Sequence, residues 1–201
     1  TLVIGIALAA IAFGSWAGGR TADIVPPRLA LGPLLAVSGA VVAFTPAAVR
    51  TAGEIPGGPV LLTAVATVFV AGAALSAVTP MVTKLQLTSL GETGSVVGRL
   101  SGVGTAGAIL GTVVTGFVLI TRLSVSAILV GLGIVLVVSA AALELALRRR
   151  RPGPLPALLV VLGGLTAAAA PGGCDVETVY HCAEVRADPD RAGGRLLVLD
   201  G

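Results

Sequence analysis

Charged side chains are scarce in this sequence: Asp, Glu, Lys and Arg together make up 11% of the 201 residues, and there is a single His. A soluble domain carries about 25% charged residues, because its surface faces water. Hydrophobic residues reach 55%, and the mean hydropathy is +1.02. Disorder is excluded as well, since disordered chains are poor in apolar residues. The composition therefore predicts a protein whose solvent is lipid.

Six apolar stretches account for this composition. A helix that crosses a bilayer needs about 20 apolar residues, and only helices or closed barrels satisfy their backbone groups in lipid. Continuous apolar runs without alternation favour helices. We therefore expect an all-α polytopic membrane bundle over residues 1–170. Its transmembrane helices, about six, are expected at residues 1–17, 29–49, 60–80, 100–120, 124–147 and 155–170, the last being the shortest.

Ionisable residues are absent from the middle of all six stretches. Ion-coupled transporters bury such groups as relays or coordination sites, so the sequence gives ion-coupled transport no support. Glu144 lies near the end of the fifth stretch, four residues before Arg148, and a surface pair between the two accounts for it. We expect no catalytic residue, no cofactor-binding residue and no metal ligand in this chain.

The basic residues predict an orientation, because Lys and Arg concentrate in cytoplasmic loops. Eight lie in the first, third and fifth loops: Arg20, Arg28, Lys84, Arg99 and the four arginines at 148–151. The second and fourth loops hold only Arg50 and Arg122. The odd-numbered loops are therefore expected in the cytoplasm, and the tail outside it if the sixth stretch spans. These residues border the membrane without forming an extended stripe, so no nucleic-acid partner is expected.

The tail, residues 171–201, has a different composition. Residues 178–186 and 195–200 are rich in strand formers, and residues 188–194 between them are rich in Asp, Pro and Gly. This order predicts a β-hairpin that begins a truncated soluble domain. A lone hairpin is marginal in water. Since the first residue is Thr and the last ones complete a strand, we expect the chain to be a fragment of a longer protein.

The first loop combines a glycine at a helix end with charges of both signs. Gly19, Ala22, Asp23 and Arg28 match the loop motif of major facilitator transporters, while two positions between them depart from it. In that interpretation the carboxylate pairs across the cytoplasmic mouth of a bundle. A capped turn whose arginine follows the positive-inside rule explains the same residues, so both interpretations stay open.

Small residues form one face of the fourth stretch. Gly104, Gly107, Gly111 and Thr115 recur at helical spacing, and the pair Gly107 and Gly111 is a small-xxx-small motif that lets helix backbones touch in lipid. Packing against another helix is the expected role, with substrate lining as the alternative. In the third stretch, Pro80 is expected to kink or end the helix, because it removes a hydrogen bond.

Cys174 and Cys182 flank the start of the predicted hairpin. Outside the cytoplasm, two thiols in these positions can form a disulfide, provided that the chain turns between them. This disulfide is the favoured interpretation. Free thiols are one alternative, and a metal site that includes His181 is another, although it lacks a fourth ligand.

These features together resemble bacterial fused proteins that join a transporter-like membrane region to a spermidine synthase-like domain. The resemblance covers nearly the whole chain and lies in three places: residues 14–20 with Ala22 and Asp23; residues 79–81 with 98–100 and 104–117; and residues 177–181 with 194–201. The last segment, Gly-Arg-Leu-Leu-Val-Leu-Asp-Gly, is similar to the opening hairpin of aminopropyltransferases.

The resemblance implies a Rossmann-like domain after Gly201 that takes decarboxylated S-adenosylmethionine as co-substrate and deprotonates the attacking amine with an acidic residue. Neither element lies in this chain. The chain would then be part of an integral protein of the bacterial plasma membrane, serving as an anchor or as a conduit for a polyamine. A major facilitator-type transporter fragment and a ligand-free scaffold are the alternatives. The sequence indicates no oligomeric state.

Overall fold

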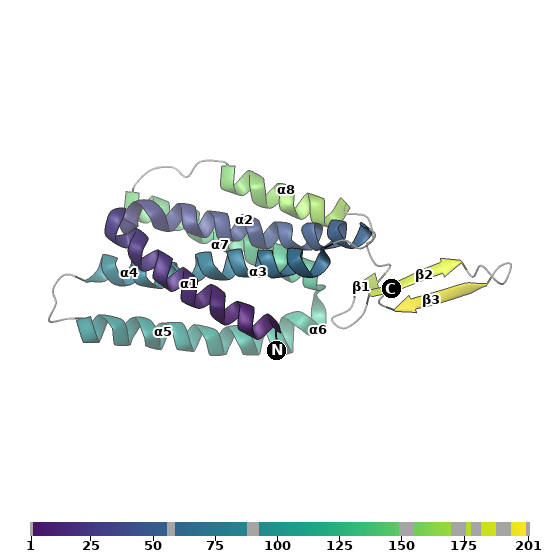
Figure 1. Cartoon of the computed structure of the whole chain (residues 1–201), viewed down its shortest axis with the longest axis horizontal. Coiled ribbons are helices and arrows are strands. Elements are labelled where there is room, and N and C mark those ends of the chain that lie inside the picture. The colour runs from purple at the N-terminus through teal and green to yellow at the C-terminus, as the bar shows by residue number, and fades with distance from the viewer. Residues whose placement is uncertain are drawn as a thin grey trace.

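The computed structural model describes residues 2–55, 59–87, 93–148, 155–169, 176–177, 182–187 and 194–199, and most of them are helical (Figure 1). The helices are α1 (Leu2–Ile24), α2 (Pro27–Glu54), α3 (Val60–Ser76), α4 (Val78–Gln86), α5 (Thr93–Val114), the π-helical turn η2 (Thr115–Leu119), α6 (Ile120–Arg122), α7 (Val125–Arg148) and α8 (Leu155–Ala169). The described helical region is therefore an all-α bundle, as predicted, and its long apolar helices are consistent with a membrane bundle.

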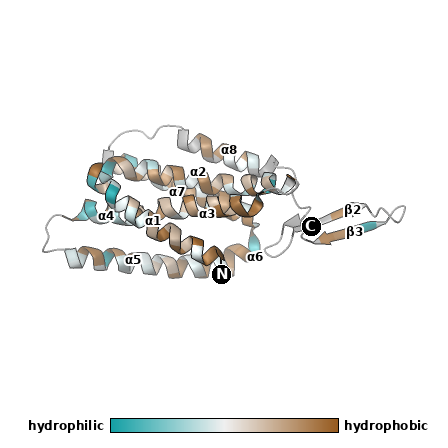
Figure 2. Cartoon of the chain, viewed as in Figure 1, coloured by the Kyte–Doolittle hydropathy of each residue, from teal (hydrophilic) through white to brown (hydrophobic). Residues whose placement is uncertain are grey.

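Five helical segments of the described chain are long and apolar enough to cross a membrane: Leu2–Ile24, Pro27–Gly53, Val60–Gln86, Thr93–Arg122 and Val125–Ala146. Hydrophilic residues gather near the α1–α2 turn and on α4 (Figure 2). Helix α8 has 15 residues, which at 1.5 Å each span about 22 Å, less than a hydrocarbon core of about 30 Å. Of the six expected spans, five therefore meet the length requirement by themselves.

Helix α1 is longer than its apolar part. Residues after Ala17 were expected in the first loop, but the helix continues to Ile24. The Thr21 hydroxyl donates to the carbonyl oxygen of Ala17 at 2.7 Å and so bonds within the helix. The turn is brief because Pro27 opens α2 at a position where a missing N–H costs nothing. The hydropathy pattern thus predicted the apolar part of α1 but not its C-terminal end at Ile24.

The third apolar stretch is interrupted, but before Pro80. Helix α3 ends at Ser76 and α4 begins at Val78, so the irregularity falls at Ala77. Pro80 occupies the first turn of α4, where its lack of an N–H is tolerated. In a continuous helix the N–H of residue 80 would bond the carbonyl oxygen of Ser76, so the interruption directly after Ser76 is the one expected of Pro80. Helix α4 then extends to Gln86 and carries Lys84 past the apolar segment.

Helix α1 packs against α3 and α4 through a row of small residues. Ala10, Gly14, Gly18 and Ala22 are buried and recur every fourth position. A Cβ built on Gly14 would overlap the carbonyl oxygen of Ala73 and lie 2.7 Å from its Cα. Such contacts join two backbones directly, as small residues allow in lipid.

Helix α2 lies at the centre of the bundle, where it packs against three other helices: α3, α7 and α8. At its contact with α7, a Cβ on Gly39 would lie 2.8 Å from the carbonyl oxygen of Gly133. Ala43, one turn further along, is completely buried. Gly163 of α8 approaches the same alanine: a Cβ added to Gly163 would lie 3.1 Å from the Cβ of Ala43. Glycine and alanine therefore set the spacing of α2, α7 and α8.

Helix α5 departs from this pattern. It runs along one side of the bundle (Figure 1), and none of its residues is buried. A Cβ added to Gly104, Gly107 or Gly111 would meet no atom within 4 Å. The prediction that this face packs against another helix is therefore wrong for the described part of the chain. Small residues permit close approach, but they do not specify a partner.

The described part of the tail forms three strands, β1 (Val176–Glu177), β2 (Cys182–Ala187) and β3 (Arg195–Leu199). They pair antiparallel in the order β1-β2-β3, with Val185 opposite Leu197. The pairing of β2 with β3 has the geometry expected of the hairpin, and β1 was not foreseen. That the hairpin begins a soluble domain, with a boundary at residue 171, stays a prediction.

Candidate functional site

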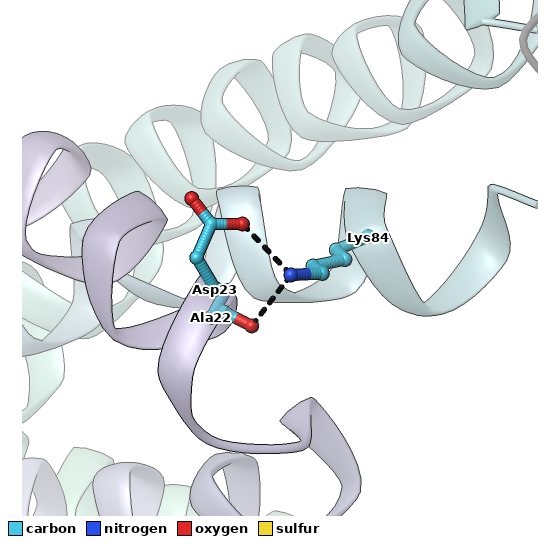
Figure 3. A network of polar contacts seen from close by, with 3 residues as sticks. All are labelled: Ala22, Asp23 and Lys84. Carbon is cyan, nitrogen blue, oxygen red and sulfur yellow. Dashed lines mark hydrogen bonds and ion pairs between the residues drawn. The ribbon is translucent and has the colours of Figure 1, made fainter.

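A polar contact joins the end of α1 to α4. The Lys84 Nζ donates to the Asp23 Oδ1 at 2.7 Å and to the Ala22 carbonyl oxygen at 2.8 Å (Figure 3). Ala22 lies in the last turn of α1, where carbonyl groups have no partner within the helix. Lys84 therefore caps α1 and neutralises Asp23 at once. We call these three residues the α1–α4 clamp.

An apolar cluster beneath the clamp fixes the helices that carry it. Ala22, Leu31 and Met81 are buried against one another and come from α1, α2 and α4. Met81 precedes Lys84 by three positions, so both lie on the same face of α4. The two clamp side chains remain hydrated, with Lys84 45% and Asp23 77% exposed. An exposed pair of this kind contributes about 0–1 kcal/mol, so it orients the helix ends more than it stabilises them.

The three residues of the predicted transporter-like motif are placed differently from one another. Asp23 makes the interhelical pair, but its partner is Lys84. Arg28 is exposed in the first turn of α2, and no ion pair within the described ranges joins it to Asp23. Gly19 has room for a side chain, since a Cβ there would lie 4.0 Å from that of Pro80. The close contact is made by Gly18 instead: a Cβ added to Gly18 would lie 2.6 Å from the Cα of Ala77.

Lys84 was expected to extend to lipid headgroups, and its role in the clamp was not predicted. One sequence signal was available. The row Ala10, Gly14, Gly18 and Ala22 indicates which face of α1 is packed, and Asp23 directly follows that row. The sequence does not give the register of α1 against α4. Asp23 and Lys84 are 61 positions apart, and only this register brings them together.

A groove of about 480 Å³ lies between α1, α2 and the α3–α4 helix pair, beside the clamp. Its lining residues are Phe13, Gly14, Ala17, Gly18, Thr21, Leu29, Ala30, Pro33, Leu34, Val37, Ala73, Ala74, Ala77 and Met81. Thr21 is the one member with a polar side chain, and its hydroxyl is already bonded to Ala17. The groove can take up an apolar group, and its lining offers no carboxylate to a cation.

The opposite end of the bundle has its own polar contact. The guanidinium of Arg50 on α2 donates to the Ser126 Oγ at 2.9 Å, and Ser126 lies in the first turn of α7. The Ser124 Oγ accepts a bond from the Ala127 N–H at 3.3 Å, as an N-cap residue does. Arg50 therefore ties α2 to the beginning of α7, which explains one of the two basic residues in the even-numbered loops.

Neither the disulfide nor the metal alternative is tested by the described residues. Cys174 and His181 lie outside them, and Cys182 is the first residue of β2. In the ranges that the structure covers, no three His, Cys, Asp or Glu residues gather closely enough to hold a metal ion. Glu144 packs against α2: a Cβ added to Gly32 would lie 2.7 Å from the Glu144 Cγ. Its pairing with Arg148 stays a prediction.

Comparison of the chain with family models, with curated proteins and with solved structures found no match. Its function is therefore inferred from the residues and contacts described above. Three features bear on it: the α1–α4 clamp, the apolar groove and the strands of the tail.

Proposed function

We propose that this chain is the membrane anchor of a fused spermidine synthase-like protein, whose soluble domain begins with strands β1 to β3. The observation that carries the proposal is the apolar interior of the bundle. Every charged residue in the described helices lies within two turns of a helix end. Groups that bind or relay ions in membranes are placed deeper and face one another. An anchor needs none of them.

The groove supports an anchor over a polyamine conduit. A polyamine carries several ammonium groups, which need carboxylates or carbonyl oxygens once they leave water. The groove lining contains neither Asp nor Glu. Asp23, two positions after the lining residue Thr21, is already paired with Lys84. A polyamine that moved along this path would therefore find no carboxylate partner in the lining.

Strand β3 supports a soluble domain that continues beyond the hairpin. Leu196 and Leu197 are neighbours and so point to opposite faces of the sheet. They are 45% and 64% exposed. A strand that is apolar on both faces is typical of a sheet covered on both sides, as in Rossmann-like domains. This pattern agrees with the resemblance of residues 194–201 to an aminopropyltransferase hairpin.

The position of α8 supports a tail on the far side of the membrane from the clamp. Gly163 packs on Ala43, midway along α2, so α8 runs beside the later half of that helix. The strands lie at the end of the bundle away from the α1–α2 turn (Figure 1). Combined with the positive-inside rule, this arrangement favours an extracytoplasmic tail. A donor made in the cytoplasm would be out of reach there, so conventional aminopropyl transfer is not the proposed reaction.

The second candidate is a fragment of a major facilitator-type transporter. One observation favours it: the carboxylate of the loop motif, Asp23, does bond a cation on another helix, and that helix follows an interruption at Ala77. Broken helices are a recurrent feature of transporters. The absence of charged residues from the groove lining places this candidate second.

Reporter fusions after Gly201 test the anchor and its orientation. Alkaline phosphatase is active only outside the cytoplasm, and green fluorescent protein fluoresces inside it. We expect an active phosphatase fusion that stays with membranes after alkaline carbonate washing. The same reporter fused to residues 171–201 alone should be released. A washed-out full-length fusion would refute the anchor. Fluorescence of the green fluorescent protein fusion would place the tail in the cytoplasm, and aminopropyl transfer would then be the proposed reaction.

Uptake measurements separate the anchor from the transporter. Proteoliposomes that contain the whole chain should accumulate labelled spermidine no faster than protein-free liposomes. Saturable uptake, reduced by replacement of Asp23 with Asn, would favour the transporter and overturn the anchor.

A further inference from the structure

The groove extends through one leaflet of a membrane. Along α1 its lining runs from Phe13 to Thr21, eight positions that correspond to about 12 Å at 1.5 Å per residue. Half of a hydrocarbon core of about 30 Å is about 15 Å. On α2 the lining runs from Leu29 to Val37 in the opposite direction. The groove therefore begins at the level of the α1–α2 turn and ends near the middle of the bilayer.

Small side chains create this space. Half of the lining residues are glycine or alanine: Gly14, Ala17, Gly18, Ala30, Ala73, Ala74 and Ala77. The helices cannot close over it, because Gly18 is already in contact with Ala77 at backbone distance. The apolar groove is therefore set by the helix packing, and water is a poor occupant for it.

A basic residue, Arg20, directly precedes Thr21, the last lining residue of α1. Arg20 follows Phe13 by seven positions, two turns, so both lie on the same side of α1. The Arg20 guanidinium lies 5.8 Å from the centroid of the Trp16 ring. The N–H donors of a guanidinium lie in its own plane, where they can bind a phosphate. The charge of Lys84 is balanced by Asp23. Arg20 therefore supplies positive charge at this level of the bundle, together with Arg28, which is exposed and precedes the lining residue Leu29.

We propose that the groove holds one acyl chain of an anionic phospholipid, whose phosphate binds Arg20. The length suits one leaflet, the lining suits a hydrocarbon chain, and the volume lies within the range of about 300–1,000 Å³ typical of ligand sites. Basic sites between transmembrane helices are known to select anionic headgroups. This inference requires that the chain lies in a membrane, and it is independent of the kinship with spermidine synthases.

Trp16 is a built-in reporter for this site, because it is the one tryptophan of the chain and is 60% exposed next to Arg20. The whole chain is placed in nanodiscs that contain phosphatidylglycerol or phosphatidylcholine brominated on the acyl chain, and bromine quenches indole fluorescence on contact. We expect half-maximal quenching at about fivefold lower mole fraction of phosphatidylglycerol, since one basic residue contributes about 1 kcal/mol to anionic lipid binding.

Two charge variants test the headgroup. R20Q should reduce the preference for phosphatidylglycerol, whereas R122Q, which replaces an exposed arginine at the other end of the bundle, should retain it. Arg20 is exposed, so its replacement leaves the packing of α1 intact. Equal quenching by the two lipids in the unmodified chain would overturn the proposal, and so would an equal loss of preference in both variants.

Two bulk variants test the acyl chain. A74F fills the groove, and A108F adds the same volume to the exposed face of α5. Native mass spectrometry from phosphatidylglycerol nanodiscs should show one fewer retained lipid for A74F and no change for A108F. Retention of that lipid by a helical A74F would overturn the proposal. If A74F does not fold, the R20Q comparison still decides it.

Discussion

Replacement of Gly14 by Ala isolates the steric contribution of the α1–α3 contact. The added methyl group would overlap the backbone of Ala73, with its carbonyl carbon and Cα both 2.7 Å away. Backbone atoms cannot rotate aside, so α1 and α3 must separate to make room for the methyl group. Overpacking of this kind costs about 1–3 kcal/mol. The substitution also raises helix propensity by up to about 1 kcal/mol, which partly conceals the cost.

Gly107→Ala on α5 is the matched control. It gains the same helix propensity, yet its methyl group meets nothing within 4 Å. Subtracting one variant from the other therefore cancels propensity and leaves overpacking alone. We expect G14A to be less stable than G107A by about 1–3 kcal/mol.

Reversible unfolding in mixed micelles, followed by circular dichroism and by the fluorescence of Trp16, measures this difference. Trp16 lies half a turn from Gly14, so separation of α1 from α3 should change its emission before global unfolding. A difference below about 0.5 kcal/mol, the usual scatter of neutral surface substitutions, would refute the backbone contact between α1 and α3.

Three further predictions follow from the packing and the charges. Gly133→Ala should destabilise the bundle by about 1–3 kcal/mol through its contact with α2, whereas Gly131→Ala, with open space around it, should not; equal effects on thermal unfolding would contradict the α2–α7 contact. Asp23→Asn should cost less than about 1 kcal/mol, and the loss should shrink at high salt because the pair with Lys84 is exposed. Maleimide labelling of the two cysteines in intact cells should require prior reduction; labelling only after permeabilisation would place the tail in the cytoplasm.

The helical segments could be predicted from the sequence because they depend on local composition. Each long apolar run became a helix, and lipid leaves few alternatives for its backbone. Helix ends were less predictable. The residues from Gly18 to Ile24 are partly polar, yet they continue α1, since a helix that leaves the hydrocarbon loses nothing by continuing into the interface.

Helix partners could not be predicted from the same pattern. Gly14 and Gly18 have the same four-residue spacing as Gly107 and Gly111, but only the first pair packs against another helix. The spacing states that two backbones can approach, and the identity of the second backbone is a property of the whole bundle. The contact between Asp23 and Lys84 is of this kind, because it depends on the register of α1 against α4.

Strand β3 has a consequence for handling the isolated polypeptide. It lies at the border of the described sheet, with β2 on one side, and its neighbouring residues Leu196 and Leu197 are exposed on opposite faces. An apolar strand at the edge of a sheet is a template on which another molecule can extend the sheet. Detergent covers the apolar helices but does not pair with the N–H and C=O groups at the edge of a strand. Self-association of the purified polypeptide is therefore expected to start in the tail and to grow with concentration, even when its helices are fully solubilised.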